Sequence, residues 1–360
     1  MSPGRLGLLL LLLIRCASAA QWNLRYFYDN ERETMHFTAL AFPSANRGIA
    51  TGVIVDEQGE RRPRNVAMIT ADGGNKWTEI KLEDEPVSLF FLDDSVGWMV
   101  TQSGIWKTEE SGRTWKRLSK HSRGMLLKVW FLDANHGFAV GQEKTVLETQ
   151  DGGKKWKPVP AAAEPTGNKD FAVYSEIAFV NSRVGLIIGS AVPPSRRGFN
   201  TAGRQVPTMT LELQTNDGGA TWKPSAAPLL GEVARLQLRG PQGLVLFAYR
   251  RQFELLSQVY RMDTVTGVSV SAYQGKNRRV TDMLMFPGHA YLAAVEPPRL
   301  AEEPQLLPGK IHVLESTDLQ EWTEMTMDYR TDGAHPLLSG PDAEHVFLAT
   351  DNGMILRLEP

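Results

Sequence analysis

One short motif recurs along this chain and constrains its architecture more than any other feature. Each copy closes a run of alternating apolar and polar residues, and in four of the five copies the acidic residue and the tryptophan keep a constant spacing. The copies are Asp72-Gly73-Gly74-x-x-Trp77, Glu110-Ser111-Gly112-x-x-Trp115, Asp151-Gly152-Gly153-x-x-Trp156, Asp217-Gly218-Gly219-x-x-Trp222 and a degenerate Asp318-x-x-x-Trp322. Self-similarity at a regular period is typical of repeat architectures, in which each repeat is one supersecondary unit.

The repeat unit is about 40 residues long and contains four short β-rich segments separated by Gly, Asn and Asp turns. Residues 88–118 and 127–159 show this order most clearly. No long segment has the 3.6-residue apolar period of a helix, so we expect very little helix. The sequence therefore predicts four-stranded antiparallel units that repeat along the chain.

The motif itself has a structural interpretation. An aspartate carboxylate can accept backbone N–H groups across the turn, and the glycines supply positive φ angles. The tryptophan then lies on the outermost strand, where it can pack between neighbouring sheets. We therefore assign a structural role to Asp72, Gly74, Trp77, Gly112, Trp115, Asp151, Gly153, Trp156, Asp217, Gly219, Trp222, Asp318 and Trp322. Glu110 in the second copy and the missing glycines after Asp318 are departures that we interpret as repeat decay.

The spacing of the tryptophans gives the number of units. The interval from Trp222 to Trp322 is long enough for two units of about 50 residues, so one unit without the motif is expected between roughly residues 231 and 273. A further unit at the C-terminus contains only three strands, which end in Gly353-Met354-Ile355-Leu356-Arg357-Leu358. The count is therefore seven.

The N-terminal segment Gln21-Trp22-Asn23-Leu24-Arg25-Tyr26 resembles the strand that the last unit lacks. We therefore predict an all-β, seven-bladed β-propeller whose ring is closed by the N-terminal strand. Closure of this kind removes the open sheet edges. The alternative is a loose N-terminal arm beside a six-bladed ring.

The N-terminus resembles a secretory signal peptide. Arg5, the apolar run Leu6 to Ile14 and the small residues Ala17 to Ala20 form its three parts, and cleavage is expected after Ala19 or Ala20. The apolar run is too short to span a bilayer. Cys16 also permits a lipoprotein, although Arg15 before it does not fit the small residues expected there.

The composition adds limits on domains, partners and compartment. We expect residues 1–20 to be a signal peptide and residues 21–360 to form a single propeller domain, exported to the periplasm or the cell exterior and monomeric. The net charge of −2 and the pI near 6.4 give no reason to expect nucleic acid as a partner. Cys16 is the single cysteine, so the mature protein would have no disulfide.

The repeats resemble the BNR/Asp-box superfamily. More narrowly, Phe131-Leu132-Asp133-x-x-x-Gly137-Phe138-Ala139-Val140-Gly141 followed by Thr149-Gln150-Asp151-Gly152-Gly153-x-x-Trp156 is similar to the seven-bladed photosystem II stability/assembly factor family. The resemblance covers about residues 21 to 360. It implies a non-enzymatic, exported assembly factor that binds partner membrane proteins, and nothing in the sequence indicates a photosynthetic role.

Three long insertions lie between the second and third strands of their blades, and should therefore share one face of the ring. They are Asp56 to Arg64, Ala191 to Val206 and Glu296 to Pro308. The candidate partner-binding arginines of these and neighbouring connections are Arg61, Arg62, Arg64, Arg196, Arg197, Arg204, Arg250, Arg251, Arg278 and Arg279. Paired guanidinium groups grip carboxylates and phosphates. We expect an acidic protein segment or an anionic glycan to bind here; the alternative is that these are solvated loop charges.

The competing hypothesis is a sialidase-like glycoside hydrolase, because those enzymes carry the same motif on a six-bladed ring. The expected Arg-Ile-Pro signature is absent. The best catalytic candidates would be Tyr174, Glu176 and Asp282, and the alternative is that they form a polar lining of the central channel. No histidine spacing or phosphate-binding loop indicates a metal or another cofactor. We therefore favour a binding scaffold without catalysis.

Overall fold

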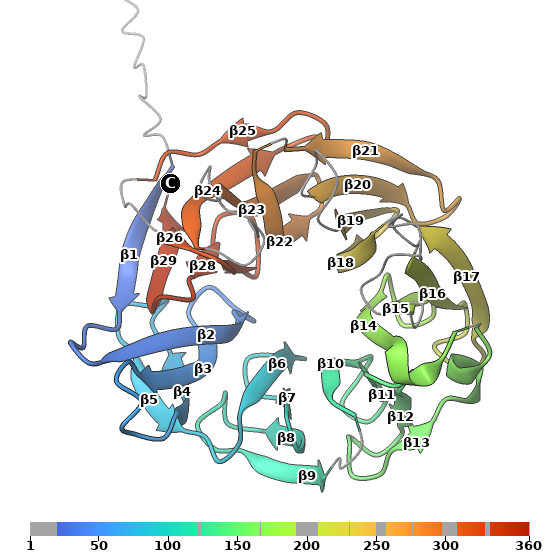
Figure 1. Ribbon diagram of the computed structural model, residues 1–360, viewed down its shortest axis with the longest axis horizontal. Coiled ribbons are helices and arrows are strands. Elements are labelled where there is room, and N and C mark those ends of the chain that lie inside the picture. The colour runs from blue at the N-terminus through green and yellow to red at the C-terminus, as the bar shows by residue number, and fades with distance from the viewer. Residues whose placement is uncertain are drawn as a thin grey trace, which may run out of the picture.

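Seven antiparallel sheets, each with four strands on its main path, are arranged in a ring around a central opening (Figure 1). This computed structural model describes residues 20–120, 124–165, 167–191, 208–229, 231–249, 257–275, 277–296, 308–327 and 332–359. The predicted all-β seven-bladed propeller is confirmed. Within those residues, the helical segments are two short 3-10 turns, η1 (Pro160–Ala163) and η2 (Lys169–Phe171).

Each blade runs from an inner strand at the channel to an outer strand at the rim. Blade one comprises β2 (Glu33–Ala41), β3 (Gly48–Asp56), β4 (Arg64–Thr70) and β5 (Thr78–Lys81). Blade two comprises β6 (Pro86–Phe91), β7 (Gly97–Thr101), β8 (Gly104–Thr108) and β9 (Lys116–Lys120). Blade three comprises β10 (Leu126–Phe131), β11 (Gly137–Gly141), β12 (Val146–Thr149) and β13 (Lys157–Pro158). Blade four comprises β14 (Ala172–Phe179), β15 (Gly185–Ala191), β16 (Thr208–Thr215) and β17 (Lys223–Leu229).

The remaining blades include the one predicted without a motif. Blade five comprises β18 (Glu232–Arg239), β19 (Gln242–Ala248), β20 (Ser257–Asp263) and β21 (Ser269–Gln274). Blade six comprises β22 (Arg279–Phe286), β23 (His289–Glu296), β24 (Gly309–Ser316) and β25 (Thr323–Glu324), and β26 (Asp332–Gly333) also pairs with β24. Blade seven comprises β27 (Leu337–Ser339), β28 (Phe347–Ala349), β29 (Met354–Glu359) and β1 (Gln21–Phe27).

The N-terminal strand closes the ring, as predicted, and the loose-arm alternative is wrong. β1 pairs antiparallel with β29, and Trp22 lies opposite Leu358. The Asn23 side-chain amide donates to a Glu359 carboxylate oxygen at 2.6 Å. The ring is therefore held together by strand pairing between the two ends of the chain, and no edge is left open at this junction.

The motif turns contain side-chain oxygens that accept backbone N–H groups. In blade one, Asp72 Oδ1 accepts from the Lys76 N–H at 2.9 Å, and Gly74 has a positive φ of 89°. In addition, Thr70 Oγ1 accepts from the Gly74 N–H at 2.9 Å. The hydroxyl that precedes the acidic residue thus completes the turn.

Acid should weaken these turns through their aspartates. Hydrogen bonds from the side chain and backbone of Thr221, and then from Thr215, lower the pKa of Asp217 from 3.8 to about 2. A lowered folded-state pKa contributes stability that is fully present above the unfolded value and is lost as the pH falls through the folded value. The thermal unfolding midpoint should therefore decrease as the pH is lowered from about 4 to about 2. In Asp217→Asn this decrease of the midpoint with pH should be smaller. Identical slopes for the two proteins would contradict this assignment.

A tryptophan joins most of the blades to the blade before it. Trp222 of blade four lies edge-on to Phe138 of blade three, with ring centroids 5.5 Å apart. Trp322 of blade six donates its indole N–H to the Ala272 carbonyl of blade five at 3.0 Å. Trp22, which is fully buried, packs in the same way against the core of blade six. Tryptophans from the motifs and from β1 thus fill six of the seven junctions. Among the described residues, the junction between blades four and five has no such tryptophan, and the indole packed against its core is that of Trp130 on β10.

Candidate binding site at the central channel

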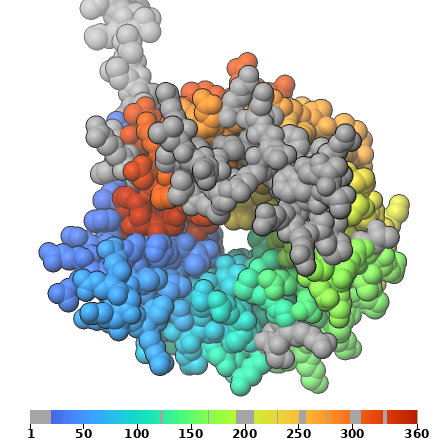
Figure 2. All heavy atoms as spheres, viewed as in Figure 1, coloured from blue at the N-terminus to red at the C-terminus, as the bar shows by residue number. Residues whose placement is uncertain are grey.

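The strand order places the three insertions on one face of the ring. They connect β3 to β4, β15 to β16 and β23 to β24. Because strand direction alternates, these connections emerge on the same face as those between blades, and the motif turns emerge on the opposite face. We call the first of these the insertion face. Figure 2 shows the central hollow between the blades.

A one-residue bulge recurs in the inner strand of six blades. The unpaired residues are Thr38, Val87, Leu127, Ser175, Ala234 and Thr281. A bulge locally redirects the strand and the side chains that follow it. The residues immediately after the bulges are Ala39, Ser88, Lys128, Glu176, Arg235 and Asp282.

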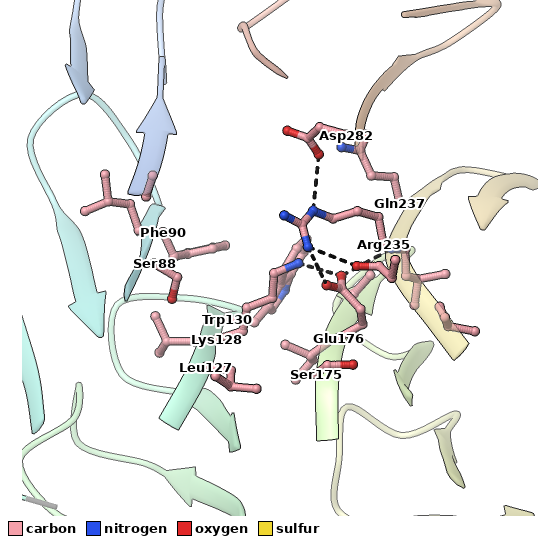
Figure 3. A pocket seen from close by; sticks show the side chains of 18 of the residues that line it. Ser88, Phe90, Leu127, Lys128, Trp130, Ser175, Glu176, Arg235, Gln237 and Asp282 are labelled. Carbon is pink, nitrogen blue, oxygen red and sulfur yellow. Dashed lines mark hydrogen bonds and ion pairs between the residues drawn. The ribbon is translucent and has the colours of Figure 1, made fainter. Parts of the chain in front are cut away.

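Four of these residues form a belt of alternating charge across blades three to six (Figure 3). Lys128 Nζ lies 2.5 Å from Glu176 Oε2, and Arg235 Nη1 lies 3.8 Å from Glu176 Oε1. Arg235 Nε continues the series at 3.3 Å from Asp282 Oδ1. We call Lys128, Glu176, Arg235 and Asp282 the charged belt. Its charges balance, so each buried carboxylate has a cation beside it.

Backbone groups of the next blade complete the belt. Glu176 Oε2 accepts from the Leu236 N–H at 3.2 Å, and Asp282 Oδ2 accepts from the Leu338 N–H at 2.8 Å. The Glu176 side chain is only 2% exposed, whereas the Arg235 side chain is 38% exposed. The carboxylates thus bind backbone groups within the channel wall, and the cationic groups are more accessible from the channel.

The channel has two unlike sides. Its cavity of about 690 Å³ is lined by the inner strands, and blades one, two and seven contribute uncharged residues such as Ala39, Phe90 and Leu337. Blades three to six contribute the charged belt. A ligand in the channel would therefore meet uncharged residues on one side and partly exposed cations on the other.

The structure does not bring Tyr174 and Glu176 together as a catalytic pair. Tyr174 is fully buried between blades three and four, and its hydroxyl donates to the Ala162 carbonyl at 3.1 Å. Burial raises the pKa of this tyrosine far above its usual value. Glu176 and Asp282 line the channel, and both contact Arg235.

The candidate arginines of blade one lie beside a shared carboxylate. Arg64 Nη2 lies 2.9 Å from Glu33 Oε2, and Arg61 Nη1 lies 3.5 Å from Glu33 Oε1. The hydrogen bond from Tyr28, followed by that from Arg64, lowers the pKa of Glu33. Arg61 remains 67% exposed and Arg62 is also exposed. Arg61 and Arg62 are therefore available to a partner, whereas Arg64 helps to hold its own blade together.

The second described pair begins blade six. Arg278 Nη1 lies 2.8 Å from Glu324 Oε2, and Arg279 Nη2 donates to the Ala334 carbonyl at 2.8 Å. Burial lowers the pKa of Arg279, while Asp351 opposes that shift. These two arginines are engaged within the blades. The other candidates, Arg196, Arg197, Arg204, Arg250 and Arg251, lie outside the described residues, as do Cys16 and most of the predicted signal peptide.

The described residues contain neither a candidate metal-binding cluster nor a membrane-spanning helix. Their histidine, aspartate and glutamate side chains form no group of three or more suited to a metal ion. None of their helices is long and apolar enough to cross a membrane. The sequence analysis did not identify Lys128 and Arg235. An alignment of the inner strands of the repeats would have placed both at the same position as the acidic candidates Glu176 and Asp282.

Fold, motif turns and channel together define an Asp-box β-propeller. Residues 117–192 match the family model described as photosynthesis system II assembly factor YCF48. The chain is similar to the chloroplastic photosystem II stability/assembly factor HCF136 of Oryza sativa subsp. japonica, at 29% identity over 33% of this chain and 24% of the relative. It is also similar to the photosystem II assembly lipoprotein Ycf48 of Nostoc, at 26% identity over 34% of this chain and 42% of the relative. The matched segments thus span less than half of these relatives.

Solved structures extend the similarity to the whole ring. One, described as YCF48 bound to D1 peptide, has a TM-score of 0.59 and 15% identity, and the match covers 95% of this chain and 100% of that one. A GH74 xyloglucanase from Xanthomonas campestris also reaches 0.59, at 11% identity over 94% of this chain and 53% of that one. At these identities the structures establish the fold. The resemblance to photosystem II assembly factor-like propellers is confirmed.

Proposed function

We propose that this protein is an exported, non-catalytic scaffold that binds a protein segment or another anionic partner on its insertion face. The observation that carries the proposal is the set of accessible cations on this side of the ring, Arg61 and Arg62 at blade one and Arg235 at the channel. Exposed guanidinium groups around one opening attract acidic groups and grip them bidentately. The relatives named as assembly factors, and the neighbour described with a bound peptide, support the same proposal.

Reversing the two exposed charges tests this proposal directly. Arg61→Glu with Arg62→Glu should weaken binding of a fluorescent acidic peptide, or of heparin as an anionic glycan, by about tenfold at low ionic strength. Fluorescence anisotropy measures both ligands. The matched control is Arg113→Glu with Lys154→Glu, because these exposed residues lie in motif turns on the opposite face. Equal losses in both double variants would show that only net charge matters, and unchanged binding in the first would refute the proposed site.

The alternative function remains a sialidase-like or related glycoside hydrolase, because Glu176 and Asp282 line a cavity of suitable size. Glycosidases need one carboxyl group that stays protonated as the acid. Both carboxylates here are instead engaged with Arg235 and with a backbone N–H of the next blade. A panel of fluorogenic sialosides and xyloglucan-derived glycosides decides the matter: turnover that disappears in Glu176→Gln or Asp282→Asn would overturn the scaffold proposal.

Export is part of the proposal and is inferred from the signal peptide predicted at residues 1–20. The alternative is a lipoprotein attached to the membrane through Cys16. Several relatives are described as lipoproteins, which adds weight to lipid attachment at Cys16. The intact mass of the mature protein separates the two routes. Cleavage after Ala19 or Ala20 leaves no cysteine, whereas lipidation retains Cys16 with its acyl groups.

A further inference from the structure

A second large cavity lies between blades four and five and shares Val233 and Leu238 with the lining of the channel. It has a volume of about 850 Å³ and reaches the hairpin that joins β20 to β21. This hairpin lies on the face opposite the insertion face. Apolar side chains from both blades line the cavity, including Leu186 and Ile188 of blade four and Phe247 and Met262 of blade five. We call this cavity the junction groove.

The groove exists because blade five lacks the motif. At the other six junctions, a tryptophan from the later blade packs against the earlier one. Blade five instead has a tight turn, in which Asp263 Oδ1 accepts from the N–H groups of Val265 at 2.9 Å and Thr266 at 2.8 Å. Ser269 lies opposite Met262 and lines the groove. A serine leaves unfilled the space that an indole occupies elsewhere in the ring.

The charge of the lining shows what would complement the groove. The charged residues in the lining are Glu212 and Asp263, and both are acidic. Burial raises the pKa of Glu212, so a cation nearby would stabilise its ionised form.

We propose that the junction groove is a docking site for a protein segment that presents a tryptophan beside a lysine or arginine. The indole occupies the position that motif tryptophans fill at the other junctions, and the adjacent cation pairs with Glu212. Tryptophan and arginine are enriched among the residues that contribute most to binding at protein interfaces. This site is separate from the proposed anionic site in both position and charge.

The test uses three short peptides that carry 5-fluorotryptophan flanked by two lysines, two serines or two glutamates. Fluorine NMR reports their binding without interference from the tryptophans of the protein. We expect the lysine peptide to bind about tenfold more tightly than the glutamate peptide, with the serine peptide between them. Glu212→Gln should remove most of the advantage of the lysine peptide while leaving the groove volume unchanged.

Filling the groove provides the second measurement. Ser269→Trp should abolish binding of all three peptides, because the new indole takes the vacant position. Val270→Trp is the matched control, since Val270 is the next residue on the same strand, is 46% exposed, and does not line the groove. Equal affinity for the three peptides, or binding that survives Ser269→Trp in a folded protein, would overturn the proposal. If Ser269→Trp does not fold, the Glu212→Gln comparison decides alone. The Arg61→Glu, Arg62→Glu variant should bind the lysine peptide normally, which separates this proposal from that of the insertion face.

Discussion

Replacing Trp22 with alanine should destabilise the protein by about 3–5 kcal/mol, the range for truncating a large buried aromatic side chain. Trp22 is fully buried, and it belongs to the strand that completes blade seven. Its loss therefore opens a cavity between blades six and seven, at the place where the two ends of the chain meet. Equilibrium unfolding in urea should show a lower midpoint, with a concurrent tendency to self-associate through the loosened edge of β29.

Phe27 provides the control for this variant because it lies on the same strand but is 50% exposed. Phe27→Ala should change the midpoint little. A similar loss in both variants would mean that β1 contributes through its backbone pairing and not through the buried indole. An unchanged midpoint in Trp22→Ala would mean that the ring does not depend on this junction.

Replacing Glu176 with alanine should have the second large effect, a loss of about 3 kcal/mol, at the lower end of the range for breaking a buried ion pair because its partners are partly exposed. Without this carboxylate, Lys128 and Arg235 face each other with no counter-charge between them, and the Leu236 N–H loses its acceptor. Glu176→Gln should lie between alanine and wild type, since an amide still accepts the N–H.

The exposed pair of Lys107 and Glu109 supplies the comparison, because Glu109 is 72% exposed. Exposed pairs contribute little to stability, so Glu109→Ala should leave the unfolding midpoint almost unchanged. If Glu176→Ala were equally silent, the charged belt would have no role in holding blades three to six together. Its charges would then be better explained by ligand binding alone.

The ring was predictable from sequence because its signals are local and repeated. Turn residues, the regular tryptophans and the unpaired N-terminal strand required only spacing arguments, and these gave the motif-free blade five and the closure by β1. The roles of the arginines were harder to predict. Arg64 and Arg278 resemble free loop charges in the sequence, but their partners Glu33 and Glu324 come from other strands.

The channel was not predictable to the same degree, and the bulges explain why. In a regular strand, Tyr174 and Glu176 would point to the same face because side chains alternate with a period of two. The bulge at Ser175 breaks that alternation, so Tyr174 enters the junction with blade three while Glu176 reaches the channel. A single unpaired residue thus separates two side chains that the sequence places together, and a pattern of residues alone does not locate it.

The pairing of β1 with β29 also dictates the order of folding. The hydrogen bond from Asn23 to Glu359 joins residues separated by 336 positions in the chain. A contact between such distant residues forms only after its loop-closure entropy has been overcome, which makes it a late event. During synthesis β1 therefore has no partner until β29 has been made, and blade seven stays incomplete until then. A chain interrupted before β29 would hold six nearly finished blades and no closed ring, with unpaired strand edges that chaperones or proteases can recognise.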